Sequence, residues 1–174
     1  RVRDKIANKS QLSDIRNVGD KGQPIPALDQ NGRGYCWMHS GVSGIVLLRA
    51  VMNLPYVGLS AYGPACVIKS FRDEGGWGAQ GLDFLVGRGV PSYEFWPNQS
   101  VDRKNDNPKT WENALLHKAC ETWADMQAAQ YDRKLSWEQQ ATLCLTNVGH
   151  IGDHNWWGHS IYHMDLVDGQ TMRG

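Results

Sequence analysis

The sequence predicts an α+β protein in which a mainly helical first part is followed by a strand-rich last part. Apolar residues recur with helical spacing over 36–54, and again over 61–71 and 79–88. The last part instead holds an alternating segment, 159–167, followed by Asp168-Gly169, a dipeptide typical of hairpin turns. Helices and strands that are segregated along the chain favour an α+β fold over a βαβ repeat.

Length and composition limit the kinds of protein that this chain can be. Its 174 residues are enough for a single domain with its own core. Eighteen basic and eighteen acidic residues leave no formal net charge, so we expect no nucleic-acid partner. No apolar run approaches the length of a membrane span and no signal-peptide pattern is present, so we expect no membrane partner and assign no compartment.

The cysteines and histidines form no recognised metal motif. The four cysteines lack CxxC or zinc-ligand spacing, and we expect mostly free thiols, with two disulfides as the alternative, at Cys36, Cys66, Cys120 and Cys144. The histidines near the C-terminal end form no HExxH motif, and strand geometry is expected to separate them. The sequence therefore predicts neither a metal nor another cofactor.

The N-terminal residues are expected to lie outside the folded domain. Residues 1–24 are polar and predict an arm with a short helix at 11–17, and residues 25–174 predict a single domain. Within that domain, 25–28 should be extended because residues that precede proline avoid the helical region. Residues 29–35 are glycine-rich and predict a loop.

Three helices are expected next. The first begins at Cys36, is apolar nearly all round and ends before Pro55, so it should be buried through the centre of the domain. Ser60 is placed to cap the second helix, over 61–71. A glycine-rich turn precedes the third helix, over 79–88, which Gly87 or Gly89 should end.

The second half begins with a polar segment, 98–110, that predicts an exposed loop or linker. A helix over 111–131 should follow, and the capping-box spacing of Ser136 and Gln139 predicts another helix to about Leu143. The sequence then predicts a strand over 144–148.

The end of the chain predicts a hairpin. Residues 149–158 read as a loop, 159–167 as a strand, and the segment from Gln170 as the partner strand. Because the sequence stops inside that strand, we expect further strands beyond Gly174.

Three residues are candidates for nucleophilic catalysis. Cys36 stands at a predicted helix start, where unpaired amides favour the thiolate. Gln30 lies six residues earlier across a glycine loop and is placed to donate to an oxyanion. His159, at the start of a strand, is the best-placed histidine to act as the base.

These residues resemble the active-site segments of papain-like cysteine peptidases. The first block is Gln30-x5-Cys36-Trp37, with Pro26, Gly34 and Ser40 at the family's spacing. The later blocks follow in the family's order, over residues 25 to 169, and are Leu59-Ser60, Gly75-Gly76-x4-Gly81-Leu82, Gly89-Val90-Pro91 and Gly158-His159-Ser160-Ile161.

The resemblance implies a two-lobed fold with the active-site cleft between its lobes. A helical lobe, about 30–97, would carry the nucleophile, and a β-rich lobe, about 111–174 with an N-terminal strand, would carry the histidine. It implies Cys36 as nucleophile, His159 as base and Gln30 as oxyanion donor. A polypeptide substrate would pair with the backbone of Gly75 and Gly76, and the groove would be walled by Trp77, Trp156 and Trp157.

The chain departs from the family in three places. The cysteine that usually precedes the active-site Gly-x-Cys is missing, which leaves Cys66 without a disulfide partner. His39 stands where an aromatic residue is common. The asparagine that orients the base does not occur, so it lies beyond Gly174, or the site works with two residues, or the site is inactive; Asp153 is another candidate for that role.

Two other functions therefore stay open beside peptide hydrolysis. One is a related Cys-His hydrolase that cleaves peptidoglycan cross-bridges. The other is a non-catalytic structural or assembly protein, part of a larger particle, that keeps the papain-like fold.

Overall fold

The computed structural model of the chain describes residues 25–126, 134–146, 149–154, 157–166 and 172–173. Within them, five α-helices and two small antiparallel sheets confirm the predicted α+β class. In chain order the elements are α3 (Cys36–Val51), α4 (Tyr62–Ile68), α5 (Gly78–Arg88), a 3₁₀ turn η2 (Arg103–Asn105), α6 (Pro108–Leu115), α7 (Trp137–Thr146), β1 (His150–His154), β2 (His159–His163), β3 (Asp165–Leu166) and β4 (Met172–Arg173). The predicted arm at 1–24, with its helix at 11–17, lies outside the described residues.

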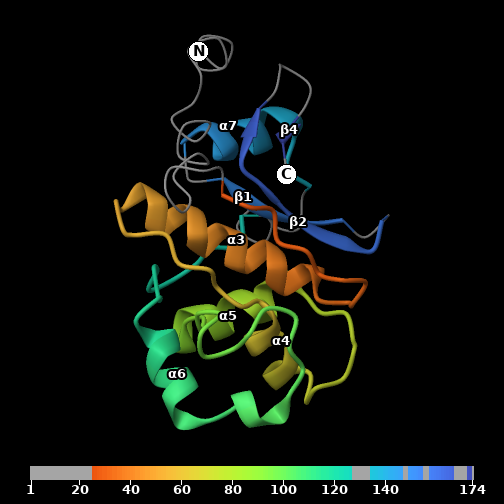
Figure 1. The fold of residues 1–174 in the computed structure, drawn as a ribbon. Coiled ribbons are helices and arrows are strands. Elements are labelled where there is room, and N and C mark those ends of the chain that lie inside the picture. Colours follow the sequence, from red (N-terminus) through yellow and green to blue (C-terminus); the bar gives the residue numbers. More distant parts are fainter. Residues whose placement is uncertain (1–24, 127–133, 147–148, 155–156, 167–171, 174) are drawn as a thin grey trace.

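Helix α3 runs through the middle of the molecule, as its apolar sequence predicted. Helices α4, α5 and α6 lie on one side of it, and β1 and β2 lie on the other (Figure 1). Two glycines let neighbours approach its backbone closely. A Cβ added to Gly41 would lie 2.9 Å from Leu85 of α5, and one added to Gly44 would lie 3.1 Å from Tyr162 of β2. Small residues on both sides of α3 therefore allow it to be covered by a helix and by a sheet at once.

Helices α4 and α5 form close to the predicted ranges, but the predicted cap of α4 is wrong. Its N-cap is Ala61, and the buried hydroxyl of Ser60 has no hydrogen-bond partner in the described part of the chain. The end of α5 is as predicted, because Gly89 is its C-cap with φ of +73°. A Cβ on Gly89 would lie against the carbonyl of Ala114, so glycine is also needed there for close packing on α6.

Most residues of the polar segment 98–110 are exposed, as predicted, but the segment is ordered by its own polar side chains and its end begins α6. Asn105 is buried and donates from Nδ2 to Ser100 Oγ at 2.9 Å. Asn107 caps α6 by accepting from the amide of Thr110, and Pro108 occupies the first turn. The polar residues that suggested a loop are here turn and cap residues that start a helix.

Helix α6 ends at Leu115, sixteen residues before the predicted end at residue 131. The apolar stripe that predicted a longer helix is not buried, since Leu115 and Leu116 are 55% and 74% exposed. The chain leaves the helix and runs back along α5, where Trp123 Nε1 donates to Asp83 at 2.7 Å. A tertiary contact thus replaces the helical continuation. Residues 127–133 lie outside the described part.

Helix α7 confirms the predicted capping box. The amide of Gln139 donates to Ser136 Oγ at 3.3 Å, and the amide of Ser136 donates to Gln139 Oε1 at 2.8 Å. The predicted strand at 144–148 is wrong for its first three residues, because α7 continues to Thr146. Cys144 is buried one turn after Ala141 on the same face of the helix, so packing extends the helix through this strand-forming sequence.

The strands form an earlier hairpin than predicted. The expected loop 149–158 contains β1, which pairs antiparallel with β2 so that His154 lies opposite His159 and Ile151 opposite Tyr162. Glycine and aspartate within β1 are poor strand formers, and the strand exists because β2 supplies its partner. The later hairpin is also present, since β3 pairs antiparallel with β4, although its turn at 168–169 lies outside the described residues.

Alternation along β2 separates two sets of side chains. Ser160 and Tyr162 lie on the face against α3, where Ser160 Oγ is 2.8 Å from Ser40 Oγ. The histidines of β1 and β2 occupy alternate positions, so they lie on the opposite face, and they are His150, His154, His159 and His163.

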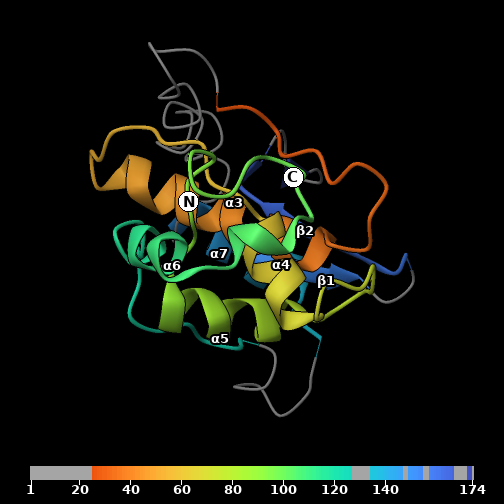
Figure 2. The ribbon, with the colours of Figure 1, turned by 60° about the horizontal axis from the view of Figure 1, so that its bottom comes forward.

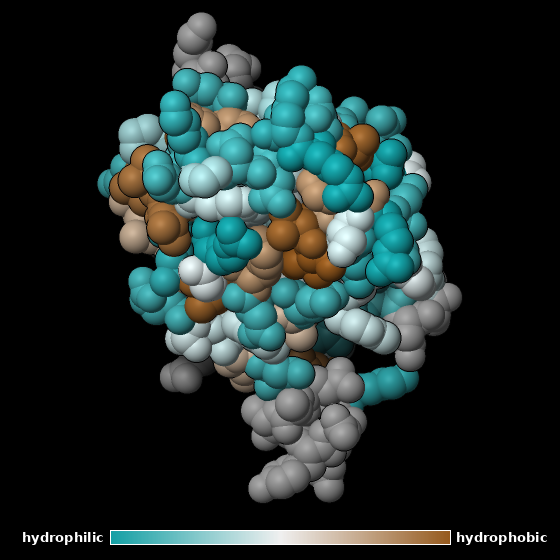
Figure 3. Space-filling view, turned by 90° about the horizontal axis from the view of Figure 1, so that it is seen from below, coloured by the Kyte–Doolittle hydropathy of each residue, from teal (hydrophilic) through white to brown (hydrophobic). Residues whose placement is uncertain are grey.

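The two other whole-molecule views agree with this arrangement. Figure 2 shows α5 and α6 next to each other on the side of α3 away from the strands. On that face the hydrophobic atoms form small separate patches among hydrophilic ones, and no continuous apolar surface is visible (Figure 3). Among the described helices none is long and apolar enough to cross a membrane.

Candidate functional site

A cavity of about 260 Å³ lies between α3, the extended segment 25–28 and β2. Its lining contains all three predicted catalytic residues, Gln30, Cys36 and His159. The remaining walls are mostly apolar, with Leu28, Leu47 and Met164 among them. The cavity is thus of the kind that holds a ligand, with a few polar groups in an apolar surround.

Cys36 is the first residue of α3 and is half-buried. Tyr35 precedes it as N-cap without contributing a side-chain cap, and its hydroxyl instead donates to the carbonyl of Arg72 at 2.9 Å. The first amides of a helix have no carbonyl partner within it. The amide of Cys36 is therefore oriented as part of a positive helix terminus beside the thiol.

The loop before Cys36 is held by neighbouring elements. The hydroxyl of Tyr62, on α4, donates to the carbonyl of Gln30 at 2.8 Å. The amide of Gly34 donates to Asp73 Oδ1 at 2.8 Å, and its carbonyl accepts from Trp37 Nε1 at 3.0 Å. These bonds fix the backbone between Gln30 and the thiol, so the two groups are held at a set separation.

The paired glycines and Trp77 do not line this cavity, and the two glycines differ from each other. A Cβ on Gly76 would lie 2.5 Å from the ring of Trp37, so that position needs glycine for packing. A Cβ on Gly75 would meet nothing within 4 Å. Gly75 nevertheless lies against the loop that precedes Cys36, because a Cβ on Gly34 would be 3.0 Å from its nitrogen. Trp77 is 70% exposed at the start of α5.

His159 is the first residue of β2 and is half-buried. Its ring centroid lies 4.8 Å from that of Trp157, which is 56% exposed. Within the described residues, no hydrogen bond reaches the His159 imidazole. Trp156, the other tryptophan expected in the groove, lies outside them.

Asp153 does not orient His159, so that expectation is wrong. Its Oδ2 accepts from the amide of Gly78 at 3.0 Å, at the N-terminus of α5. In β1 it lies opposite Ser160, on the face that packs against the helices. The carboxylate therefore ties the hairpin to a helix terminus, where a negative charge is favourable.

His39 also lines the cavity. Its Nδ1 lies 2.8 Å from the carbonyl of Tyr35, which can only accept, so Nδ1 carries a proton. Burial lowers the pKa of His39, and the carbonyls of Tyr35 and Asp29 oppose that shift only in part. The imidazole ties the first turn of α3 to the loop that precedes Cys36.

The cysteines are free thiols, as expected. Cys66 is buried, and burial raises its pKa, with the hydroxyl of Tyr35 3.9 Å from its sulfur. Cys120 is half-buried, and burial raises its pKa as well. Neither of them lines the cavity.

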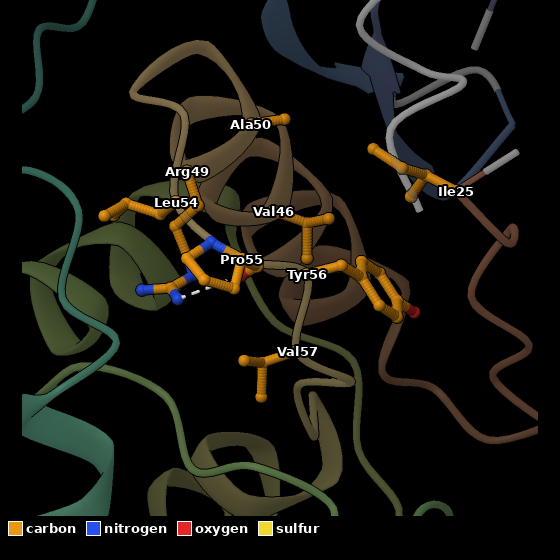
Figure 4. Close-up of a pocket in the computed structure, with 8 residues that line it drawn as sticks. All are labelled: Ile25, Val46, Arg49, Ala50, Leu54, Pro55, Tyr56 and Val57. Carbon is orange, nitrogen blue, oxygen red and sulfur yellow. Dashed lines mark hydrogen bonds between the residues drawn. The ribbon is translucent and has the colours of Figure 1, made fainter. Parts of the chain in front are cut away.

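A second cavity, at the other end of α3, is only about 10 Å³ in volume (Figure 4). Arg49 Nη2 donates across its mouth to the carbonyl of Pro55 at 3.3 Å. A space of this size holds no more than a water molecule, so it is a packing feature and not a ligand site.

Comparison with known proteins adds no relative to this picture. No family model matches the chain, and no curated protein or solved structure matches it significantly.

Proposed function

We propose that the protein is a papain-like thiol hydrolase that cleaves peptide bonds in an extended polypeptide. The single observation that carries this proposal is the shared cavity of Gln30, Cys36 and His159. The cysteine and the histidine come from distant parts of the chain and from different kinds of element. A chance meeting of a helix-start cysteine, an amide and an imidazole around one cavity is a weaker explanation than a catalytic constellation.

The chemistry follows from the roles of these groups. His159 takes the proton of Cys36, and the thiolate attacks the carbonyl carbon of the peptide bond. The Gln30 side-chain amide and the Cys36 backbone amide donate to the oxyanion of the tetrahedral intermediate. His159 then protonates the leaving amine and a thioester forms. Water, deprotonated by His159, hydrolyses the thioester and regenerates the thiol.

The surroundings of the cavity supply places for the substrate. In a papain-like, two-lobed arrangement the peptide would lie past Gly75, whose position leaves room for another backbone to pair with it. The ring of Trp157 contacts the imidazole of His159 and would reduce its exposure to water, which would strengthen the interaction of that imidazole with a thiolate.

A thiol-directed epoxide of the E-64 type tests the nucleophile and its base. Mass spectrometry should find one adduct on Cys36 in the wild type and none there in Cys36→Ala. Slower labelling by at least about tenfold is expected in His159→Ala, because the base no longer assists. Cys120→Ala is the matched control, since that half-buried cysteine lies outside the cavity. Equal labelling rates in wild type and His159→Ala would reject the Cys-His pair.

The substrate is tested separately with a fluorogenic peptide library and with purified peptidoglycan. Peptide turnover that depends on Cys36 supports the proposal. Turnover of peptidoglycan alone would move the same chemistry to cross-bridge hydrolysis. Labelling of Cys36 with no turnover of either substrate would favour the non-catalytic assembly protein.

A further inference from the structure

The face of the β1–β2 hairpin that is turned away from α3 carries a cluster of histidines with no role in the proposed hydrolysis. His154 Nε2 and His163 Nε2 lie 3.1 Å apart, and the ring of His150 stacks on that of His163 with centroids 4.8 Å apart. Among the described residues, no carboxylate forms an ion pair with His150 or His163.

Gly152 creates the space in which two of these rings meet. A Cβ at this position would lie 2.7 Å from His163 Nε2 and 3.1 Å from His154 Nε2. The register places Gly152 between His150 and His154 on the same face of β1. Any larger residue would push the two nitrogens apart.

Two imidazole nitrogens in this cluster are buried without a hydrogen-bond partner among the described residues. His163 is only 8% exposed, and its Nδ1 is buried without a hydrogen-bond partner in the described part of the chain, as is Nδ1 of His150. Burying imidazole nitrogens without partners costs free energy that apolar side chains at the same positions would not. The rings of His150 and His163 therefore lie in this cluster at a cost in stability that hydrogen bonds of their Nδ1 atoms do not offset.

We propose that His154 and His163 bind one divalent transition-metal ion, of which Zn²⁺ is the representative, above Gly152. Two nitrogens that each lie about 2.0–2.1 Å from a tetrahedral Zn²⁺ are about 3.3–3.4 Å apart, close to the 3.1 Å between these atoms. Imidazole is a preferred ligand of Zn²⁺, Cu²⁺ and Ni²⁺ and a poor one of Mg²⁺ and Ca²⁺.

The coordination is that of a two-histidine site. Among the described residues no three histidine, cysteine or acidic side chains gather as a complete set of metal ligands. Water would therefore fill the other positions. Each neutral imidazole offers Nε2 when its proton sits on Nδ1, so the ion replaces the hydrogen bond between the two rings without a change in their charge.

The test is a titration of the full chain with ZnCl₂, followed by calorimetry in the presence of a phosphine reductant. One Zn²⁺ should bind per chain and raise the unfolding temperature. His154→Ala should weaken binding by at least about tenfold, because even second-shell partners of a metal contribute that much. Gly152→Ala should weaken it with both histidines still present. Gly87→Ala is the matched control, since a Cβ there meets nothing within 4 Å.

Two further variants separate this site from the proposed catalytic pair. Cys36→Ala and His159→Ala should bind Zn²⁺ as tightly as the wild type. Loss of binding in either would assign the ion to the catalytic cavity and overturn the proposal. Absence of binding in the wild type, or equal binding by His154→Ala, would overturn it as well. Failure of the hydrolase tests leaves these outcomes unaffected.

Discussion

Ser40 Oγ and Ser160 Oγ lie 2.8 Å apart in the buried contact between α3 and β2. Ser40 is one helical turn after Cys36, and Ser160 directly follows His159. The hydroxyl of Ser40 donates to the carbonyl of Trp37 at 3.0 Å, so Ser160 is the donor in the bond between the two serines. This bond sets the position of the strand that carries the histidine relative to the helix that carries the thiol.

Ser40→Ala should therefore be more harmful than Ser160→Ala. The first change leaves the buried hydroxyl of Ser160 without an acceptor and should lower the free energy of unfolding by about 1–3 kcal/mol. The second leaves only an acceptor unused and should cost less. Urea unfolding measures both, and the double variant should lose less than the sum. Strict additivity of the two losses would contradict the bond.

The two adjacent glycines should respond differently to alanine. Gly76→Ala forces a Cβ into the ring of Trp37 and should destabilise the fold by about 1–3 kcal/mol. Gly75→Ala has room and should leave stability unchanged within about 0.5 kcal/mol. If the substrate backbone passes Gly75, that variant should raise KM for a peptide. Thermal unfolding beside peptide kinetics separates the two effects.

Asp153→Ala should reduce stability without changing chemistry. Its carboxylate accepts from the Gly78 amide at the start of α5, and loss of such a contact costs about 0.5–2 kcal/mol. At a temperature well below the unfolding temperature, where the variant is folded, its rate of Cys36 alkylation should equal that of the wild type. A marked fall in that rate would restore Asp153 as the residue that orients His159.

The stability of the protein should fall as the solution is acidified. The folded-state pKa of His39 is lowered by burial, so the unfolded chain binds its proton more readily than the folded one. The contribution of His39 is fully present above its unfolded pKa of about 6.5 and is lost as pH falls below it, at up to about 1.4 kcal/mol per pH unit. His117, His150 and His163 have lowered pKa values as well and add to the slope.

His39→Phe isolates one part of this pH dependence. It keeps an aromatic ring in the first turn of α3 and removes the titrating group. Denaturant unfolding between pH 8 and pH 5, with a chelator present, should give a shallower loss of stability than in the wild type. An unchanged slope would show that His39 does not titrate as a buried group.

Local sequence patterns were sufficient to predict those elements whose tertiary packing agrees with the helix propensity of their own residues. The apolar sequence after Cys36 predicted the central helix, and Ser136 with Gln139 predicted the cap of α7, because each signal acts within a few residues. The sequence also indicated that Cys36, Gln30 and His159 belong together, through spacing that only the resemblance could interpret.

Other features depended on partners that are distant in the chain. The strand β1 has little strand propensity of its own and forms by pairing with β2. Helix α6 ends earlier than predicted, and Trp123 beyond it donates a hydrogen bond to Asp83 on α5. The sequence allowed Asp153 to orient His159, but the alternation of side chains along β1 places its carboxylate at the amide of Gly78. Contacts between distant segments decide which strands pair and which face of a strand is buried. The free energy of these contacts exceeds the small local preferences of the residues for helix or strand.

The sequence by itself thus determined which side chains were available for chemistry and which helix would carry the thiol. The tertiary structure alone decided that one cavity holds Cys36, His159 and Gln30, and that His154 and His163 meet over Gly152. The period of two along β2 places His159 and His163 on one face and Ser160 and Tyr162 on the other. Which face is buried depends on the helix that packs there, and no residue of the strand encodes that alone.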